Sequence, residues 1–96
     1  MRYAAKTDAN QADIVRAFRS IGATVQILSM VGHGCPDTLV GFRGRNILVE
    51  IKNSSLVLSK QQLTKDQIAW HAGWNGQVIV ANSIQSAVVA VIEAAK

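Results

Sequence analysis

The sequence predicts an α/β fold in which helices flank a small mixed β-sheet, in the order α-β-β-β-α-β-α. Short runs rich in β-branched residues alternate with segments whose apolar residues recur every three or four positions. Apolar residues make up 49% of the chain, which is typical of a globular protein and argues against disorder. The 96 residues match the size of one domain, so we expect a single domain over 1–96.

The first helix and the first strand are predicted from the first 30 residues. Thr7 or Asp8 can cap the helix, and Gly22 can end it. Residues 23–30 then alternate in polarity and contain β-branched side chains, which predicts a strand. The apolar stripe of the helix consists of Ile14, Ala17, Phe18 and Ile21.

A loop followed by a β-hairpin is predicted over residues 31–52. Two glycines and a proline interrupt residues 31–36, so we expect a loop there. Thr38–Phe42 and residues 47–52 read as strands, joined by a turn in which Gly44 can adopt a positive φ. We expect the side of the second strand that carries Ile47, Val49 and Ile51 to pack on a helix.

The second half predicts a loop, a helix, a strand and a final helix. The loop covers residues 53–63, and Thr64-x-x-Gln67 is a capping-box pattern that opens a helix ending near Gly73. Residues 77–81 predict a buried strand, and Ser83 can cap the last helix. We expect Ile68, Ala69 and Ala72 to face the core, together with the stripe of Ile84, Ala87, Val88, Val91, Ile92 and Ala95.

The net charge of +4 and the pI near 9.7 suit a polyanionic partner, although a merely basic soluble protein fits the charge equally well. One cysteine, Cys35, excludes an internal disulfide and fits a reducing compartment. No apolar run approaches the roughly 20 residues of a membrane span, and the N-terminus lacks a secretory apolar region. We therefore expect an intracellular protein that does not enter a membrane.

Asp37 and Glu50 are placed to share a cation. If the hairpin pairs its two strands, Asp37 lies across from the strand end that carries Glu50 and Lys52, whose side chains share one face about 6.5 Å apart. Two carboxylates with water and phosphate are a common Mg²⁺ site, and a nearby lysine can stabilise developing negative charge. The alternative is a solvated Glu–Lys pair with Asp37 as an ordinary turn residue, and spacing alone leaves both open.

Pro36-Asp37 followed by Glu50-x-Lys52 resembles the signature of the PD-(D/E)xK nucleases, whose restriction-endonuclease-like core has the order αβββαβ. Here a C-terminal helix follows that core. The wider pattern resembles the VRR-NUC (virus-type replication-repair nuclease) domain, in particular the stand-alone members carried by phages and prophages. It consists of Gly32-x-Gly34-x-Pro36-Asp37, Gly41-Phe42-Arg43-Gly44, Glu50-Ile51-Lys52 and Leu63-Thr64-x-x-Gln67.

The resemblance implies an endonuclease that depends on Mg²⁺ or Mn²⁺. Asp37 and Glu50 would be metal ligands, with the carbonyl of Ile51 as a third. Lys52 would be the catalytic lysine. Gln67 would orient a water or phosphate, although it can also serve simply as the capping-box partner of its helix.

The superfamily often adds an acid from the first helix. Asp13 is the candidate here, but Gln11 could occupy the aligned position, in which case one acid is missing. Stand-alone members are associated with homodimers that cut four-way DNA junctions. The resemblance therefore implies a homodimeric Holliday junction resolvase in the cytoplasm of a bacterial or phage-infected cell, with no small-molecule cofactor. A nuclease for flap or linear DNA, or a catalytically weak nucleic-acid-binding module, are the alternatives.

Four basic residues are candidates for contacts with phosphate. Arg43 and Arg45 flank the hairpin turn, which we expect near the site, although both can instead be solvated. Lys60 and Lys65 bracket the start of the second helix.

Trp70 and Trp74 are spaced by four residues on that helix. We favour the core or a dimer interface for them over a base-stacking surface.

Overall fold

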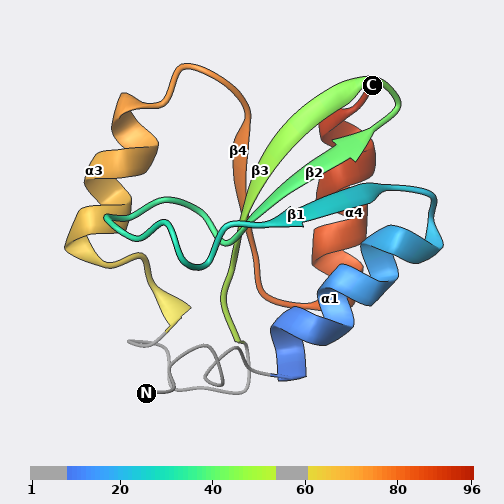
Figure 1. Cartoon of the computed structure of the whole chain (residues 1–96), viewed down its shortest axis with the longest axis horizontal. Coiled ribbons are helices and arrows are strands. Elements are labelled where there is room, and N and C mark those ends of the chain that lie inside the picture. The colour runs from blue at the N-terminus through green and yellow to red at the C-terminus, as the bar shows by residue number, and fades with distance from the viewer. Residues whose placement is uncertain (1–8, 54–60) are drawn as a thin grey trace.

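A four-stranded mixed sheet forms the centre of the computed structural model, which describes residues 9–53 and 61–96 (Figure 1). The strand order is β1-β2-β3-β4; the first three strands are antiparallel, and β4 runs parallel to β3. The strands are β1 (Thr24–Ile27), β2 (Thr38–Phe42), β3 (Arg45–Ile51) and β4 (Val78–Ala81), and the helices are α1 (Ala9–Ser20), α3 (Lys65–Gly73) and α4 (Ile84–Ala94). The predicted fold class and element order are confirmed.

Helices α1 and α4 pack together on one face of the sheet, whereas α3 lies apart from them on the other side (Figure 1). We call these the core face and the open face. On β3, alternate residues point to the core face as predicted, and the residues between them point to the open face. The core consists of Ile14, Phe18, Ala23, Val40, Ile47, Val49, Ile51, Ala81, Ala87, Val91 and Ala95.

Gly22 ends α1 as predicted. Its φ is +93°, and the N–H of Ala23 donates to the carbonyl of Phe18 at 3.0 Å, as in a Schellman motif. The predicted cap at Thr7 or Asp8 lies outside the described residues. Strand β1 is shorter than the predicted 23–30, since the chain turns away from the sheet after the N–H of Leu28 bonds the carbonyl of Asp37 at 2.7 Å.

The hairpin between β2 and β3 has a two-residue turn, Arg43-Gly44. Both residues have positive φ, +52° and +78°, which suits the twist of the strands. The β2–β3 ladder ends with the pair of Thr38 and Val49, and the next position in the same register sets Asp37 opposite Glu50. The hairpin thus sets the two acids opposite each other.

Helix α3 opens with the predicted capping box of Thr64 and Gln67. The expectation that Ile68, Ala69 and Ala72 face the core is wrong, because all three are exposed and α3 buries no residue. The side of the helix that carries Gln67 and Trp70 faces the sheet instead. Of the predicted loop 53–63, residues 54–60 lie outside the described part.

Strand β4 is an edge strand, which corrects the prediction of a buried one. Val80 is 47% exposed, and of the four residues only Ala81 is buried. On α4, which Ser83 caps as predicted, Ala87 and Val91 are buried whereas Ile84 is exposed. No helix within the described residues is long and apolar enough to cross a membrane.

Candidate functional site

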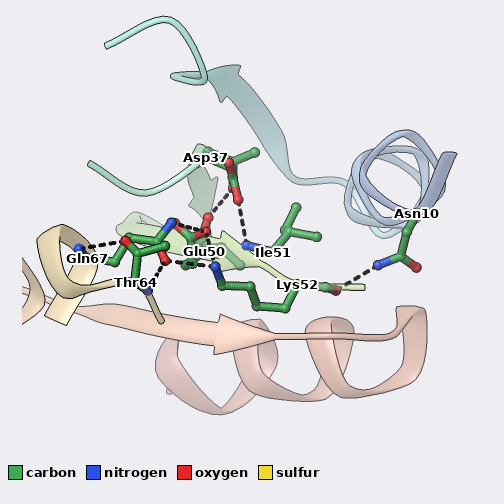
Figure 2. A network of polar contacts seen from close by, with 9 residues as sticks. Asn10, Asp37, Glu50, Ile51, Lys52, Thr64 and Gln67 are labelled. Carbon is green, nitrogen blue, oxygen red and sulfur yellow. Dashed lines mark hydrogen bonds and ion pairs between the residues drawn. The ribbon is translucent and has the colours of Figure 1, made fainter. Parts of the chain in front are cut away.

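Asp37 is held at the start of β2 by main-chain contacts. Its side-chain Oδ2 accepts a 2.8 Å hydrogen bond from the N–H of Ile51, and its carbonyl accepts the bond from Leu28. The two contacts join β1, β2 and β3 at one residue, and Figure 2 shows the bond from Ile51 to the carboxylate. The side chain is half-buried, so it lies at the border between the interior and solvent.

Glu50 lies on the open face of β3, and only 2% of it is exposed. Burial, and then the negative charge of Asp37, raise its pKa from 4.5 to about 8, although the ammonium of Lys52 acts in the opposite direction. When two carboxylates approach each other in a buried place, either one of them takes up a proton or a cation binds between them. The pair of Asp37 and Glu50 is therefore suited to bind a proton or a cation.

The two oxygens of Glu50 differ in their partners. Oε2 accepts a 3.0 Å hydrogen bond from Nε2 of Gln67 and lies 3.6 Å from Nζ of Lys52. Oε1 is buried and has no hydrogen-bond partner among the described residues. An unpaired buried carboxylate oxygen is costly, and hard divalent cations prefer such ligands. The residues present therefore fit a Mg²⁺ or Mn²⁺ ion between Glu50 Oε1 and Asp37.

The carbonyl of Ile51 was implied by the family resemblance as a third ligand. Two steps beyond the last pair of the β2–β3 ladder, Ile51 would face Pro36, which has no N–H to donate. The N–H and carbonyl of one strand residue point to the same neighbouring strand, and here the N–H is taken by Asp37. The carbonyl of Ile51 thus points towards β2, where the proline at position 36 offers it no N–H donor, and it lies on the side of β3 from which Asp37 comes.

Lys52 is held beside Glu50 by Gln67. Oε1 of Gln67 accepts a 2.7 Å hydrogen bond from Nζ of Lys52 and a 2.9 Å hydrogen bond from the N–H of Thr64. Nε2 of Gln67 donates a hydrogen bond to Glu50 (Figure 2). Gln67 therefore closes the capping box and contacts the site at once. Its role in a reaction stays a prediction.

The loop before Asp37, residues 31–36, packs on α3, and we call it the glycine loop. A Cβ at Gly34, where φ is +87°, would lie 2.4 Å from the main-chain oxygen of Asp66. At Gly34 the backbone therefore approaches the first turn of α3, which carries Gln67, so closely that only glycine fits.

The first helix brings an amide to the site. Nδ2 of Asn10 donates a 2.8 Å hydrogen bond to the carbonyl of Lys52, a contact that no sequence signal had indicated (Figure 2). Gln11 is buried and donates to Ser29, whereas Asp13 is paired with Arg16 at the helix surface. No group of three acids, histidines or cysteines suited to a metal occurs within 9–53 and 61–96. Asp13 is thus not brought to the acid pair.

The basic residues lie at different distances from the site. The expectation that Arg43 and Arg45 lie near it is wrong, since their turn closes the opposite end of the hairpin, about 17 Å from Asp37 at 3.3 Å per residue. Arg43 stacks on the ring of Phe42 at 4.9 Å. Lys65 is the first residue of α3 and is exposed. Lys60 lies outside the described residues.

Two further titratable side chains surround the acid pair. Burial, and then Glu50 and Asp37, raise the pKa of the Cys35 thiol, which favours its protonated form over the nucleophilic thiolate. Burial, and then Lys52, lower the pKa of His71, which favours its neutral form. In the described part of the chain, Lys52 is therefore the cation next to the carboxylates.

Trp70 and Trp74 stack on each other at the side of α3 that faces the sheet, with ring centroids 4.8 Å apart and planes inclined by 16°. Trp74 is 45% exposed and Trp70 is half-buried, so a place in the core is wrong for Trp74.

Comparison of the whole structure gives a match to a solved structure described as "VRR_NUC domain". It covers 85% of this chain and 89% of that chain, with 25% sequence identity and a TM-score of 0.66. No protein-family model matches the sequence, and no curated protein does. The resemblance to the VRR-NUC domain drawn from the sequence is thus confirmed at the level of the structure, and it supports a nuclease domain.

Proposed function

We propose that this chain, which has the fold of a VRR-NUC domain, is a divalent-metal-dependent endonuclease that hydrolyses phosphodiester bonds in DNA. One observation carries the proposal. Glu50 Oε1 is buried and has no hydrogen-bond partner within residues 9–53 and 61–96, while Asp37 lies opposite and Oε2 of the same carboxylate lies 3.6 Å from the ammonium of Lys52. An unpaired buried carboxylate oxygen beside a second acid and a lysine is typical of a functional site, and here it suits the binding of a cation and an anionic substrate.

Asp37, Glu50 Oε1 and the Ile51 carbonyl are the groups that would hold Mg²⁺ or Mn²⁺. When bound, such an ion polarises the phosphate and lowers the pKa of a water that attacks it. Hard oxygen ligands of this kind suit Mg²⁺ and Mn²⁺ better than Zn²⁺. No nitrogen or sulfur ligand is needed in this assignment.

Lys52 supplies a fixed positive charge beside the reacting phosphate. Its ammonium donates a 2.7 Å hydrogen bond to Gln67, and its side chain is only 11% exposed, so water screens the charge little. There it stabilises the negative charge that develops during cleavage. Asn10 fixes the main chain of the same residue, which keeps the lysine and the acid pair in register.

The resemblance to stand-alone VRR-NUC members implies a four-way junction as substrate, and the single acid pair then bears on the assembly. One chain with one acid pair can cut one strand, so paired cuts across a four-way junction require two copies, most simply a two-fold dimer. The outward side of α3 supports this, because Ile68 is 57% exposed next to the exposed Ala69 and Ala72. We therefore propose a homodimeric Holliday junction resolvase in the cytoplasm of a bacterial or phage-infected cell.

The deciding experiment compares cleavage of a labelled four-way DNA junction with cleavage of matched duplex, single-stranded and flap substrates. Each is incubated with Mg²⁺, Mn²⁺ or EDTA. The variants are Asp37→Ala and, as a matched control, Asp13→Ala, whose surface pair with Arg16 contributes at most about 1 kcal/mol. We expect metal-dependent, symmetric cuts in the junction that Asp37→Ala abolishes and Asp13→Ala preserves.

Other outcomes point to the alternatives. Cutting of flap or linear DNA alone would retain the site and remove the junction-resolving role. Salt-sensitive binding without any cleavage would make the chain a nucleic-acid-binding module. Equal loss of activity in both variants would contradict the assignment of the acid pair.

A further inference from the structure

An apolar groove runs along the open face of the sheet, between α3 and the strands. Trp70 and Trp74 line one side, and Leu39 of β2 and Leu48 of β3 line the other. Its volume is 290 Å³, at the lower end of the range of small-ligand sites. The groove has room for one flat group of modest size.

The groove adjoins the acid pair. Leu48 precedes Glu50 by two residues on the same face of β3, which places the two side chains about 6.6 Å apart. Trp70 lies one helical turn after Gln67, which bonds Glu50 and Lys52. Cys35, which also lines the groove, is two residues before Asp37. A group bound in the groove therefore lies next to a phosphate bound at the acids.

The two indoles present a ready stacking surface. They already stack on each other, and Trp74 is 45% exposed. Gly76 keeps space for this ring, because a Cβ there would lie 2.8 Å from Nε1 of Trp74. An exposed aromatic ring in a held position can stack on a base of any sequence.

We propose that this groove takes an unstacked nucleobase from the nucleotide next to the scissile phosphate. The inference rests on the proposed function and extends it to how the site recognises its substrate. A base in a continuous duplex is stacked on both sides and is not presented to the groove, whereas a base at a junction, gap or single strand is. The groove would thus select DNA with unpaired or unstacked bases at the cut, without reading their sequence.

Intrinsic fluorescence tests this directly, because Trp70 and Trp74 are the two tryptophans of the chain. The protein is titrated without divalent cations, so that binding is measured apart from cleavage. The three probes are a fully paired duplex, the same duplex with a short single-stranded gap, and the gapped duplex with abasic sites in place of the unpaired nucleotides. The abasic probe keeps the phosphate backbone and removes only the bases.

We expect the gapped duplex to quench the fluorescence and to bind about tenfold more tightly than its abasic counterpart. Trp74→Ala should remove this difference, whereas Trp74→Phe should largely keep it. Equal binding of the gapped and abasic probes, with unchanged fluorescence, would overturn the inference. So would a fluorescence change that follows protein concentration but not DNA, since a second copy of the chain would then cover the groove.

Binding of a base in the groove and cleavage at the acid pair can fail independently of each other. Metal-dependent cleavage that does not distinguish gapped from abasic DNA would overturn the groove and leave the nuclease in place. Base-dependent quenching by a protein that cleaves neither these probes nor a four-way junction with Mg²⁺ or Mn²⁺ would overturn the nuclease and support the groove.

Discussion

Nε2 of Gln67 donates a 3.0 Å hydrogen bond to Oε2 of Glu50, and this contact joins α3 to the buried end of β3. The same side chain closes the capping box of the helix. Because α3 buries none of its residues, its position depends strongly on such polar contacts. Helix and site are therefore coupled through one glutamine.

Two substitutions of Gln67 should separate these two tasks. Gln67→Ala removes the partners of Thr64, Glu50 and Lys52, and we expect a loss of about 1–3 kcal/mol in the free energy of unfolding as well as slower cleavage. Gln67→Glu keeps an acceptor for the capping box and for Lys52 but puts a like charge beside Glu50. It should keep the stability that comes from the capping box, lose the stability that comes from the bond to Glu50, and cleave at least tenfold more slowly. Urea unfolding and kcat/KM measure the two effects, and wild-type cleavage by Gln67→Glu would show that the bond to Glu50 is dispensable.

The raised pKa of Glu50 predicts how stability depends on pH. Its folded-state pKa of about 8 exceeds the ordinary 4.5, so the bound proton stabilises the fold, in full below about pH 4.5 and no longer above about pH 8. Without divalent cations, the free energy of unfolding should fall across this window. In Glu50→Gln, which keeps the shape without the charge, that fall should be absent. Unfolding in EDTA at several pH values measures it, and parallel curves for the two proteins would refute this assignment.

Mg²⁺ should replace the proton at the acid pair. Its stabilising effect should therefore be larger near pH 8 than near pH 6 in the wild type, and nearly absent in Glu50→Gln.

Local patterns predicted most of the fold. The Gly22 stop, the Arg43-Gly44 turn and the Thr64–Gln67 capping box each involve contacts within a few residues, and all three occur as expected. The apolar residues Ile68, Ala69 and Ala72 predict the wrong side of α3 as the buried one. The polarity pattern predicts the buried side of a helix only where the helix packs through its apolar residues. Helix α3 is instead held by the hydrogen bonds of Gln67 and by its contact with the glycine loop.

The sequence was sufficient to predict those positions of the site that the register of the hairpin determines. Alternation on β3 and the short turn were enough to place Asp37 opposite Glu50, but the same register puts Arg43 and Arg45 at the far end, which spacing along the chain does not reveal. The contact from Asn10 to the carbonyl of Lys52 joins residues 42 apart. No local pattern encodes such a contact, because it depends on how α1 crosses the sheet.

Gly34 and Gly32 offer a matched pair of substitutions. Both have positive φ, so alanine at either costs about 1 kcal/mol of strain. Only at Gly34 would the new Cβ meet the backbone of Asp66, whereas nothing lies within 4 Å at Gly32. We expect Gly34→Ala to displace α3, lower the unfolding temperature further and slow cleavage by at least tenfold, while Gly32→Ala keeps activity within about twofold. Equal effects of the two on cleavage would show that the contact with α3 does not position the site.

The outward side of α3 predicts where two copies meet. Ile68 is 57% exposed there, and Val89 of α4 is similarly exposed at 52%, away from this side. A buried aspartate at an interface is strongly unfavourable, whereas an exposed one is nearly neutral. If α3 forms the dimer interface, Ile68→Asp should convert dimer to monomer and replace paired cuts in a four-way junction by single nicks. Val89→Asp should stay dimeric and cut both strands.

Sedimentation measures the mass of each variant, and junction cleavage in a supercoiled plasmid distinguishes nicks from paired cuts. Dissociation by Val89→Asp alone would move the interface to α4. A wild-type protein that is monomeric at all concentrations but still makes paired cuts would contradict the dimer itself, since each chain would then have to cut twice from one acid pair.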